Sequence, residues 1–348
     1  MIPALWSKRK IYSTKYTPSN PIVLDLTKYG VTTDFVGEID IELTGTLNTG
    51  SGGIGTATGK TNPEDLLLNC TLTTNPVVAT CIPFNNVSGR TLLVDDAFWR
   101  GCFRKSPAIV DNSGNVTVNT TWKLHLKRQG VKKGIEYGLD MTRYTSAILN
   151  LRFGDQTTLY TGSSNTWDMS TLTVNVYVHS AFNVSPSQIH ASELFEQTYP
   201  ITQTQSDFLI NNLSPGWMYT DWYFMLERNN ALVNDVLTNI DIEGGGRIWV
   251  PQGDTNANII QKTFTLDNFD GSVVSPDDPD KNTNTALITG IYGISMRNNS
   301  GMYSRQIDSL VAQIISKLAV TYVSGTQSLR LAGRRMVPGA VYKAPKAA

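Results

Sequence analysis

The feature that most constrains the fold of this chain is an alternation of apolar and polar residues, which is clearest in the segment 171–202. Its first part places Leu172, Val174, Val176 and Val178 at every second position. A period of two buries one face of a strand and leaves the other face in water. The alternation stops at 183–186, a short polar run follows, and a new strand pattern begins near Ile201. The segment is therefore predicted to join two β-rich halves.

Short strand-like runs of the same kind fill both halves. In the first half they cover 22–26, 34–47, 66–72, 77–82, 91–94, 117–126, 147–153 and 172–178, with a hairpin turn at 112–114. About eight short strands is the number in a jelly-roll barrel. We therefore predict an all-β chain of two tandem jelly-roll β-barrels with short helices in its loops. The predicted order is an N-terminal arm (1–21), a first barrel (22–183), a linker (184–200), a second barrel (201–338) and a C-terminal tail (339–348).

The composition disfavours some classes of function. The 348 residues contain 29 Lys plus Arg and 29 Asp plus Glu, so the formal net charge is zero. Such neutrality argues against a general nucleic-acid binder of the histone kind. Cys70, Cys81 and Cys102 form no CxxC pair, which favours buried free thiols over a zinc site, while a Cys70–Cys81 bridge stays open. Neither a secretion signal nor a membrane-spanning segment is recognised.

Charge is nevertheless distributed unevenly along the chain. Residues 1–24 contain four cations and no acid, and residues 309–348 contain six cations and no acid. These cations are Lys8, Arg9, Lys10, Lys15, Lys317, Arg330, Arg334, Arg335, Lys343 and Lys346. One interpretation is a pair of solvated tails. The other is that both ends face something anionic, such as lipid headgroups or packaged nucleic acid.

Two glycine-rich motifs resemble nucleotide-binding sites but lack the context that such sites require. Gly50, Gly52 and Gly55 satisfy G-x-G-x-x-G, yet no helix pattern follows whose N-terminus would hold a pyrophosphate. The segment 59–61 resembles the end of a phosphate loop, yet Ile54 occupies the position that needs glycine. Both motifs are therefore predicted to form a hairpin loop.

The histidines and the acidic loop give no metal-binding pattern. His125, His179 and His190 have no metal-ligand spacing, so each is predicted to be a locally hydrogen-bonded or polar-face residue. The acidic segment 277–280 offers oxygen ligands for Ca²⁺ but lacks the EF-hand spacing, which favours a solvated loop. We expect no cofactor and no metal.

Pairs of acids near aromatic residues are the best candidates for catalysis. Asp95 and Asp96 lie close to Trp99, and Asp221 lies beside Trp222, as a glycosidase would require. Nothing in the sequence places the two pairs across a cleft, and no G-x-S-x-G elbow is present. We expect a protein without enzymatic activity.

The region 229–250 carries a resemblance to a known family. An Asn-rich turn at 229–230 precedes an aspartate-aliphatic step at 235–237, an Ile-x-Ile strand at 240–242, a glycine turn at 244–246 and an aromatic strand at 247–250. A strand at 317–323, a turn at 324–326 and a final strand at 328–337 complete the pattern. This order resembles the second barrel of double-jelly-roll major capsid proteins, which occur in bacteriophages and other tailless icosahedral viruses with internal membranes. The resemblance covers most of 22–338.

This resemblance implies a structural protein of the virion. Three chains would form a pseudo-hexagonal capsomer of an icosahedral shell around an internal membrane, assembled in the host cytoplasm. The implied partners are further copies of the chain, neighbouring capsomers, penton and minor capsid proteins and the lipid membrane, with no sequence-specific nucleic acid. Both termini would face the membrane, and the residues expected to contact it are Trp6, Lys8, Arg9, Lys10, Lys343 and Lys346.

A carbohydrate-binding or glycoside-processing β-sandwich is the alternative function. The chain contains 7 Trp and 14 Tyr, whose large apolar faces suit the stacking of sugar rings. Trp122, Trp167 and Trp249, however, lie in strand-like or turn contexts that favour packing in a core or between subunits. The lack of a recognised secretion signal also disfavours an extracellular lectin.

Overall fold

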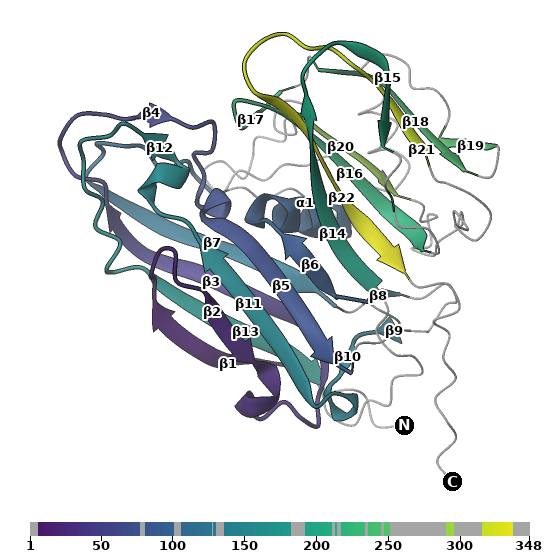
Figure 1. Cartoon of the computed structure of the whole chain (residues 1–348). Coiled ribbons are helices and arrows are strands. Elements are labelled where there is room, and N and C mark those ends of the chain that lie inside the picture. Colours follow the sequence, from purple (N-terminus) through teal and green to yellow (C-terminus); the bar gives the residue numbers. More distant parts are fainter. Residues whose placement is uncertain are drawn as a thin grey trace.

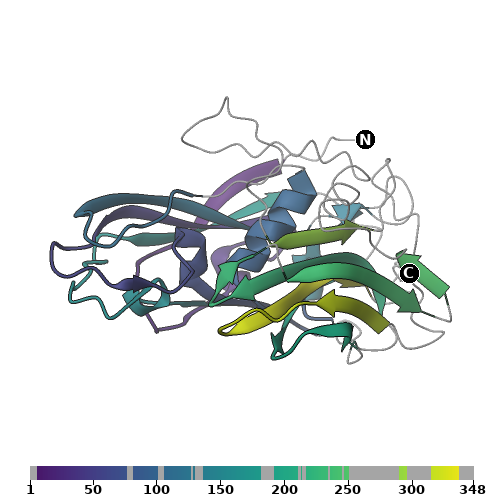
Figure 2. The same ribbon diagram turned by 90° about the horizontal axis from the view of Figure 1, so that it is seen from above.

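A computed structural model shows that β-strands form most of the described part of the chain (Figures 1 and 2). It describes residues 6–76, 81–100, 106–126, 128–129, 136–181, 192–210, 213, 217–233, 236–244, 247–250, 290–295 and 315–336. Within these ranges the only α-helix is α1 (Gly89–Arg100). No helix of the described residues is long and apolar enough to cross a membrane. The all-β prediction is confirmed.

Two layers of strands form the first half of the chain. One layer is a five-stranded sheet with β3 (Phe35–Asn48) at its centre. On one side β3 pairs with β13 (Thr173–Ala181), which in turn pairs with β1 (Trp6–Lys15). On the other side β3 pairs with β7 (Asn115–His125) and with β10 (Leu139–Asp140). The other layer consists of β2 (Ile22–Asp25), β11 (Ser146–Phe153), β5 (Leu67–Asn75) and β6 (Phe84–Val87). The two layers overlie one another in Figure 1, and a single hydrophobic core fills the space between them.

Strand β3 shows how the alternating sequence builds this barrel. Ile39, Ile41 and Leu43 are fully buried in the core. Glu38 and Asp40, at the intervening positions, form their ion pairs with residues of the polar face of the sheet. Because side chains alternate between the faces of a strand, the aliphatic set of β3 joins the core and the acidic set stays outside it.

The second half is also made of two sheets. One contains β14 (Ser192–Ile201), β22 (Gln327–Met336), β16 (Met218–Arg228), β17 (Ala231–Leu232) and β20 (Ile291–Ser295). The other has the order β15 (Gln205–Ile210), β21 (Ile315–Val320), β18 (Leu237–Gly244) and β19 (Arg247–Val250). The Asn-rich turn predicted at 229–230 joins β16 to β17, and both asparagines have a positive φ. A second core, which contains Trp222 and Phe224, lies in this half.

One sheet runs through both halves of the molecule. Its nine strands have the order β17–β16–β22–β14–β6–β5–β11–β2, with β20 also paired to β16. The halves meet where β14 pairs in parallel with β6, with Leu194 opposite Phe84. All other strand pairs among the described residues are antiparallel. The two barrels are therefore connected by backbone hydrogen bonds as well as by the chain.

Three predictions of local structure differ from what the structure shows. Residues 192–200, assigned to the linker, belong to strand β14, whose polar residues bind arginines of β22. Residues 91–94, predicted as a strand, lie in helix α1, whose buried side chains pack against β7 and β5. The N-terminal arm contains β1, which takes its hydrogen-bonding partners from β13.

The remaining short elements lie in loops, as predicted. The two-stranded pairs are β4 (Thr56–Ala57) with β12 (Tyr160–Thr161), and β8 (Arg128–Gln129) with β9 (Glu136–Tyr137). The 3₁₀ helices are η1 (Leu26–Tyr29), η2 (Pro63–Leu66), η3 (Met141–Arg143) and η4 (Gln156–Thr158). The G-x-G-x-x-G motif is followed by β4, so it has no helix N-terminus for a phosphate. The turn at 112–114 leads into β7, but no strand precedes it as a hairpin would require.

The two described cysteines are free thiols. Cys70 and Cys81 are both buried and form no disulfide, and Cys102 lies outside the described residues. Burial disfavours the thiolate and raises the pKa of both groups. They therefore contribute to packing rather than to chemistry.

The glycine-rich loop is held in place by one carboxylate, Asp111. Its oxygens accept hydrogen bonds from the backbone N–H of Gly55 (2.7 Å), the Asn165 side-chain amide (2.9 Å) and the Trp167 indole N–H (2.8 Å). Desolvation of the carboxylate opposes ionisation, but these hydrogen bonds outweigh it and lower the pKa of Asp111 to about 2. The ionised carboxylate therefore connects the loops that carry β4 and β12.

We predict that Asp111→Asn loosens this end of the barrel in a pH-dependent manner. Asparagine keeps only one oxygen, so either the Gly55 N–H or the donors of Asn165 and Trp167 would face an NH₂ group that cannot accept. The lost acceptor should cost about 1–3 kcal/mol in the free energy of unfolding. Because the folded pKa is about 2 and the ordinary value is 3.8, the wild-type advantage should be complete above 3.8 and should shrink as the pH falls toward 2. Urea denaturation at several pH values measures this difference.

Asp207→Asn on the exposed face of β15 is the matched control and should change stability very little at any of these pH values. A difference between wild type and Asp111→Asn that stays constant down to pH 2 would contradict the assignment of an ionised Asp111.

Candidate functional site

The N-terminal residues predicted to contact a membrane lie on strand β1. This strand pairs antiparallel with β13, and Lys8 stands opposite His179. Trp6 is 41% exposed and its ring packs edge-on against Phe35 at a centroid distance of 6.0 Å. Lys343 and Lys346 lie outside the described residues.

Two of the four cations on β1 are paired with acids of the same chain. The ammonium of Lys8 lies 2.6 Å from the carboxylate of Asp40. The guanidinium of Arg9 lies 3.5 Å from Asp34 and donates to the carbonyl oxygen of Gly30. Lys10 contacts a neutral side-chain amide instead. Lys8 and Arg9, two of the four cations in residues 1–24, are therefore neutralised by acids in the folded chain.

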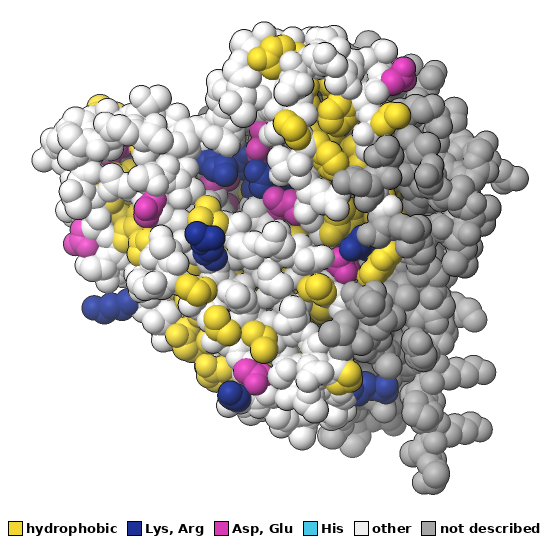
Figure 3. Space-filling model, in the orientation of Figure 1, with side chains coloured by type: hydrophobic (Ala, Val, Ile, Leu, Met, Phe, Trp, Pro, Cys, Tyr) yellow, Lys and Arg dark blue, Asp and Glu magenta, His cyan; other side chains and the backbone are white. Residues whose placement is uncertain are grey.

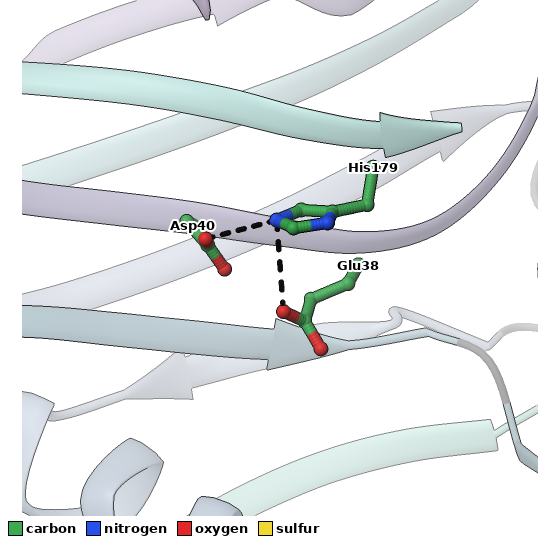
Figure 4. Close-up of side chains that lie close together, drawn as sticks. All are labelled: Glu38, Asp40 and His179. Atoms are coloured by element: carbon green, nitrogen blue, oxygen red, sulfur yellow. Dashed lines mark hydrogen bonds and ion pairs between the residues drawn. The ribbon is translucent and has the colours of Figure 1, made fainter. Parts of the chain in front are cut away.

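Glu38, Asp40 and His179, on the polar face of the first sheet, are the only group among the described residues that could hold a metal ion (Figure 4). His179 Nε2 lies 2.9 Å from Asp40 Oδ2 and 3.7 Å from Glu38 Oε1. Glu38 and Asp40 also bind the ammonium of Lys123, at 2.8 and 3.0 Å. A divalent cation would have to displace ammonium groups that already bind these oxygens. The cluster fits a network of ion pairs across four strands better than a metal centre.

Asp40 stays ionised at the centre of this network. Its burial opposes ionisation, but hydrogen bonds from His179 and Lys8 and the charge of Lys123 outweigh the burial. They hold the pKa of Asp40 well below its usual range. The predicted role of His179, a locally hydrogen-bonded residue on a strand, agrees with this geometry.

His125 extends the network toward helix α1. Its Nε2 lies 2.6 Å from Asp96 of α1, and its Nδ1 lies 3.0 Å from Glu38 of β3. The imidazole is almost fully buried, so it connects the helix to the sheet through two carboxylates. Its local hydrogen bonding was predicted, whereas His190 lies outside the described residues.

The largest set of buried charges lies between the two barrels, where β16 and β22 are covered on both faces. One face of these strands, with Trp222 and Leu331, belongs to the second core. The other face, with Tyr223, Met225 and Ala332, belongs to the core of the first half. Helix α1 lies beside this second face at the junction of the two halves (Figures 1 and 2).

A completely buried ion pair joins the helix to the sheet at this junction. The guanidinium of Arg334 donates to both oxygens of Asp95, at 2.9 and 2.5 Å, and both side chains are 0% exposed. The hydroxyl of Tyr223 donates to the same carboxylate at 3.0 Å, and Arg334 stacks over the ring of Phe84. Such a bidentate pair has a fixed geometry, so it sets how the second barrel sits on the helix.

A second network of arginines and acids continues the junction. Arg90 of α1 binds Asp65 of the first half at 2.9 Å and Glu227 of the second half at 2.7 Å. Arg330 binds Glu227 at 3.1 Å and Glu196 at 2.7 Å. Figure 3 shows basic and acidic side chains gathered in the hollow between the two lobes. Charges from both barrels therefore neutralise one another there.

Lys60 lies in the same charged region, and its pKa is lowered by burial and by the nearby positive charges of Arg330 and Arg90. The segment 59–61, which resembles the end of a phosphate loop, therefore has its lysine in the junction between the two barrels, close to Glu227 and Asp65 of the same chain.

These pairs correct the interpretation of a basic C-terminal segment. Arg330, Arg334 and Arg335 lie in β22, and each binds a carboxylate of the same chain. They do not form a tail facing an external anion. Sequence alone gave no signal for this, because Arg330 and Arg334 alternate with buried Leu331 as exposed charges on a one-sided strand would.

The suggested glycosidase acids are also engaged in internal contacts. Asp95 binds Arg334, and Asp96 binds His125. Asp221 is fully buried within β16. They are separate buried groups rather than two carboxylates facing a substrate cleft.

Comparison with known proteins identifies the fold. No family model matches the sequence, and no curated protein matches it. A chain in the atomic structure of Sulfolobus Turreted Icosahedral Virus superposes with a TM-score of 0.65 at 12% identity, covering 96% of this chain and 91% of that chain. The major capsid protein P2 of bacteriophage PM2 gives 0.59 at 9% identity, covering 96% and 97%. The Faustovirus major capsid protein gives 0.57 at 8% identity, covering 97% and 91%.

These matches extend over nearly the whole of each chain, so they include both barrels. The chain therefore has the double-jelly-roll fold of viral major capsid proteins. The predicted fold class is confirmed. At these identities the likeness establishes the fold, and function requires a separate argument.

We predict that Asp95→Asn strongly destabilises the junction. The change leaves the guanidinium of Arg334 buried without its anion, which costs about 3–5 kcal/mol for pairs of this kind. Removing both charges in Asp95→Asn/Arg334→Met should cost less than Asp95→Asn alone, because no buried charge is left unpaired. Chemical denaturation of the three proteins measures these differences.

Arg143→Gln is the control, because it breaks a partly exposed pair with Asp140 within a short helix. It should cost less than about 1 kcal/mol. Equal effects of Asp95→Asn and Arg143→Gln would refute the importance assigned to the buried pair.

Proposed function

We propose that this chain is the major capsid protein of an icosahedral virus. The observation that carries the proposal is the match of capsid-protein folds to 96% of the chain, which includes both barrels and the junction between them. The charged groups that sequence suggested for catalysis bind one another inside the fold, which supports a structural role rather than an enzymatic one. The protein would act in the virion after assembly in the host cytoplasm.

The proposed unit of assembly is a homotrimer. Two similar barrels in each chain give six in a trimer, so threefold symmetry generates a nearly hexagonal capsomer. Such capsomers tile a shell, and penton and minor capsid proteins would complete it at other positions. No sequence-specific contact with nucleic acid is part of this proposal.

The alternative, a carbohydrate-binding sandwich, receives less support. Trp122 and Trp167, which were expected to pack in a core or between subunits, are buried. Their indole N–H groups donate to the backbone oxygen of Glu64 and to the carboxylate of Asp111. Neither ring is available to stack on a sugar. The side chain of Trp249 lies outside the described residues.

We further propose that the shell surrounds an internal membrane, with Trp6, Lys8, Arg9, Lys10, Lys343 and Lys346 on the membrane side. The pairing of Lys8 with Asp40 and of Arg9 with Asp34 reduces what these two cations contribute. Lys10 and the two C-terminal lysines are therefore the main expected electrostatic contacts. Each would contribute about 1 kcal/mol near an anionic surface, within a Debye length.

The trimer is tested by light scattering coupled to size exclusion. We expect a particle with three times the 38.3 kDa chain mass at micromolar concentration and neutral pH. Electron microscopy of the same fraction should show a six-lobed outline. A stable monomer with no larger species would contradict the proposed capsomer.

Membrane contact is tested by co-sedimentation with lipid vesicles. Binding should be clear with anionic vesicles at low salt and should fall as salt rises. Lys343→Gln/Lys346→Gln should weaken it more than Lys8→Gln, because Lys8 is already paired with an acid. Equal binding to neutral and anionic vesicles, or none to either, would exclude the electrostatic membrane contact and leave the capsid proposal in place.

A further inference from the structure

The side-chain amide of Asn175 lies between an amine and a carboxylate on the polar face of the first sheet. Lys10 Nζ of β1 lies 3.1 Å from Asn175 Oδ1, and Glu42 Oε2 of β3 lies 3.1 Å from Asn175 Nδ2. Asn175 on β13 stands opposite Ser13 of β1 and opposite Glu42 of β3. Three neighbouring strands thus each supply one member of a Lys–Asn–Glu group.

The hydrogen bonds fix which end of the amide faces which partner. Lys10 and the hydroxyl of Ser13 both donate to Oδ1, the latter at 2.8 Å. A carboxylate can only accept, so Glu42 must face the NH₂ group. Asn175 itself is only 6% exposed, and Tyr177 donates to the same oxygen of Glu42 at 3.2 Å. The amide is therefore held in one orientation with a nucleophile next to its carbonyl.

We propose that Lys10, Asn175 and Glu42 form an intramolecular isopeptide bond. Once the Lys10 amine has lost a proton to solvent, its lone pair attacks Cγ of Asn175, and the Cγ–Nδ2 bond breaks. Glu42 accepts a proton from the attacking nitrogen and delivers a proton to the leaving nitrogen, which departs as ammonia. The products are one secondary amide and one ammonia molecule, so the step needs no oxidant, reductant or further reactant.

Ser13 and Glu42 lie where the addition of the nitrogen and the departure of ammonia require them. The hydroxyl of Ser13 already donates to Oδ1, where negative charge develops as the nitrogen adds to the carbonyl. Glu42 already contacts the leaving nitrogen. The pairing of β1 with β13 holds the Lys10 amine next to the Asn175 amide. The attack therefore needs only a short movement of Nζ from Oδ1 to Cγ.

The neighbouring Lys8–Asp40 pair lacks these properties. Asp40 is held ionised by Lys8, His179 and Lys123, so its carboxylate has no neutral carbonyl for an amine to attack. The amide of Asn175 is neutral at every pH and carries its own leaving group. The proposed bond therefore involves Lys10 and not Lys8, the other lysine of β1 that contacts a side chain of another strand.

The bond would fasten β1, the outermost strand of its sheet, to β13. It joins residues 165 positions apart, so it restricts the unfolded chain as well as the folded one. The inference does not depend on the proposed capsid role, because it concerns contacts within one chain. The bond would, however, remove the charge of Lys10 and leave Lys343 and Lys346 as the main electrostatic contacts with a membrane.

Intact-mass spectrometry of the purified full-length chain tests the proposal. The amine must lose its proton before attack, so the protein is incubated at about pH 9, closer to the ordinary lysine pKa of about 10.4. We expect the mass to fall by one ammonia molecule, faster at this pH than at neutral pH. Protease digestion should then yield one branched peptide that contains both residue 10 and residue 175.

Three variants separate this bond from other losses of ammonia. Lys10→Arg keeps the positive charge but should keep the full mass. Glu42→Gln should slow the loss by about a hundredfold or more, since a hundredfold is about the lower end for general acid–base catalysis. Asp40→Asn changes the adjacent ion pairs and should still form the bond. Hydrolysis of Asn175 adds water as ammonia leaves, so it gives no comparable fall in mass.

Two results would overturn the proposal. One is a wild-type mass that stays at the full sequence value after prolonged incubation. The other is an equal loss of ammonia from Lys10→Arg, which would identify a succinimide at an asparagine instead. A protein that is monomeric by light scattering should still lose one ammonia molecule, so the two proposals can fail separately.

Discussion

The buried ion pair between Asp95 and Arg334 is the contact on which the two-barrel arrangement depends. It joins the single described α-helix, which belongs to the first half, to a strand that completes the second half. A buried charge without a partner is very costly, whereas a paired one costs far less. The sheet of the second barrel therefore has one favourable position on the helix, and the parallel pairing of β14 with β6 follows from that position. The pair therefore fixes the position of the second barrel on the helix more than it adds to the stability of the fold.

The alternating strands and the fold class were predictable from sequence. β3, β7, β11 and β13 appear where period-two patterns indicated them, because each has a face that is buried in a core and a face that is not. β22 also appears where a strand was predicted, although both of its faces are covered. The turn at 229–230 was also predictable, since asparagine tolerates the left-handed conformation that the turn requires. The order of these elements was enough to indicate the double jelly roll.

The charged contacts were not predictable, because their partners are far apart in the sequence. Asp95 and Arg334 are separated by 239 positions, and no local pattern joins them. Helix α1 was missed because its Thr91–Val94 stretch is β-branched and aliphatic, and burial against β7 and β5 outweighs that local preference. Strand β1 was missed because its run of cations resembles a solvated tail until Asp34 and Asp40 are seen beside it.

The position of β22 has a consequence for how the chain is synthesised. This strand lies between β14 and β16 and ends at Met336, so the last described segment is central to a sheet rather than at its edge. While the chain is being translated, the first half leaves the ribosome before the arginine that its helix requires has been made. A product that ends before residue 327 lacks the strand that β14 and β16 share. Incomplete chains would therefore remain partly unfolded, because β14 and β16 would lack the strand that joins them.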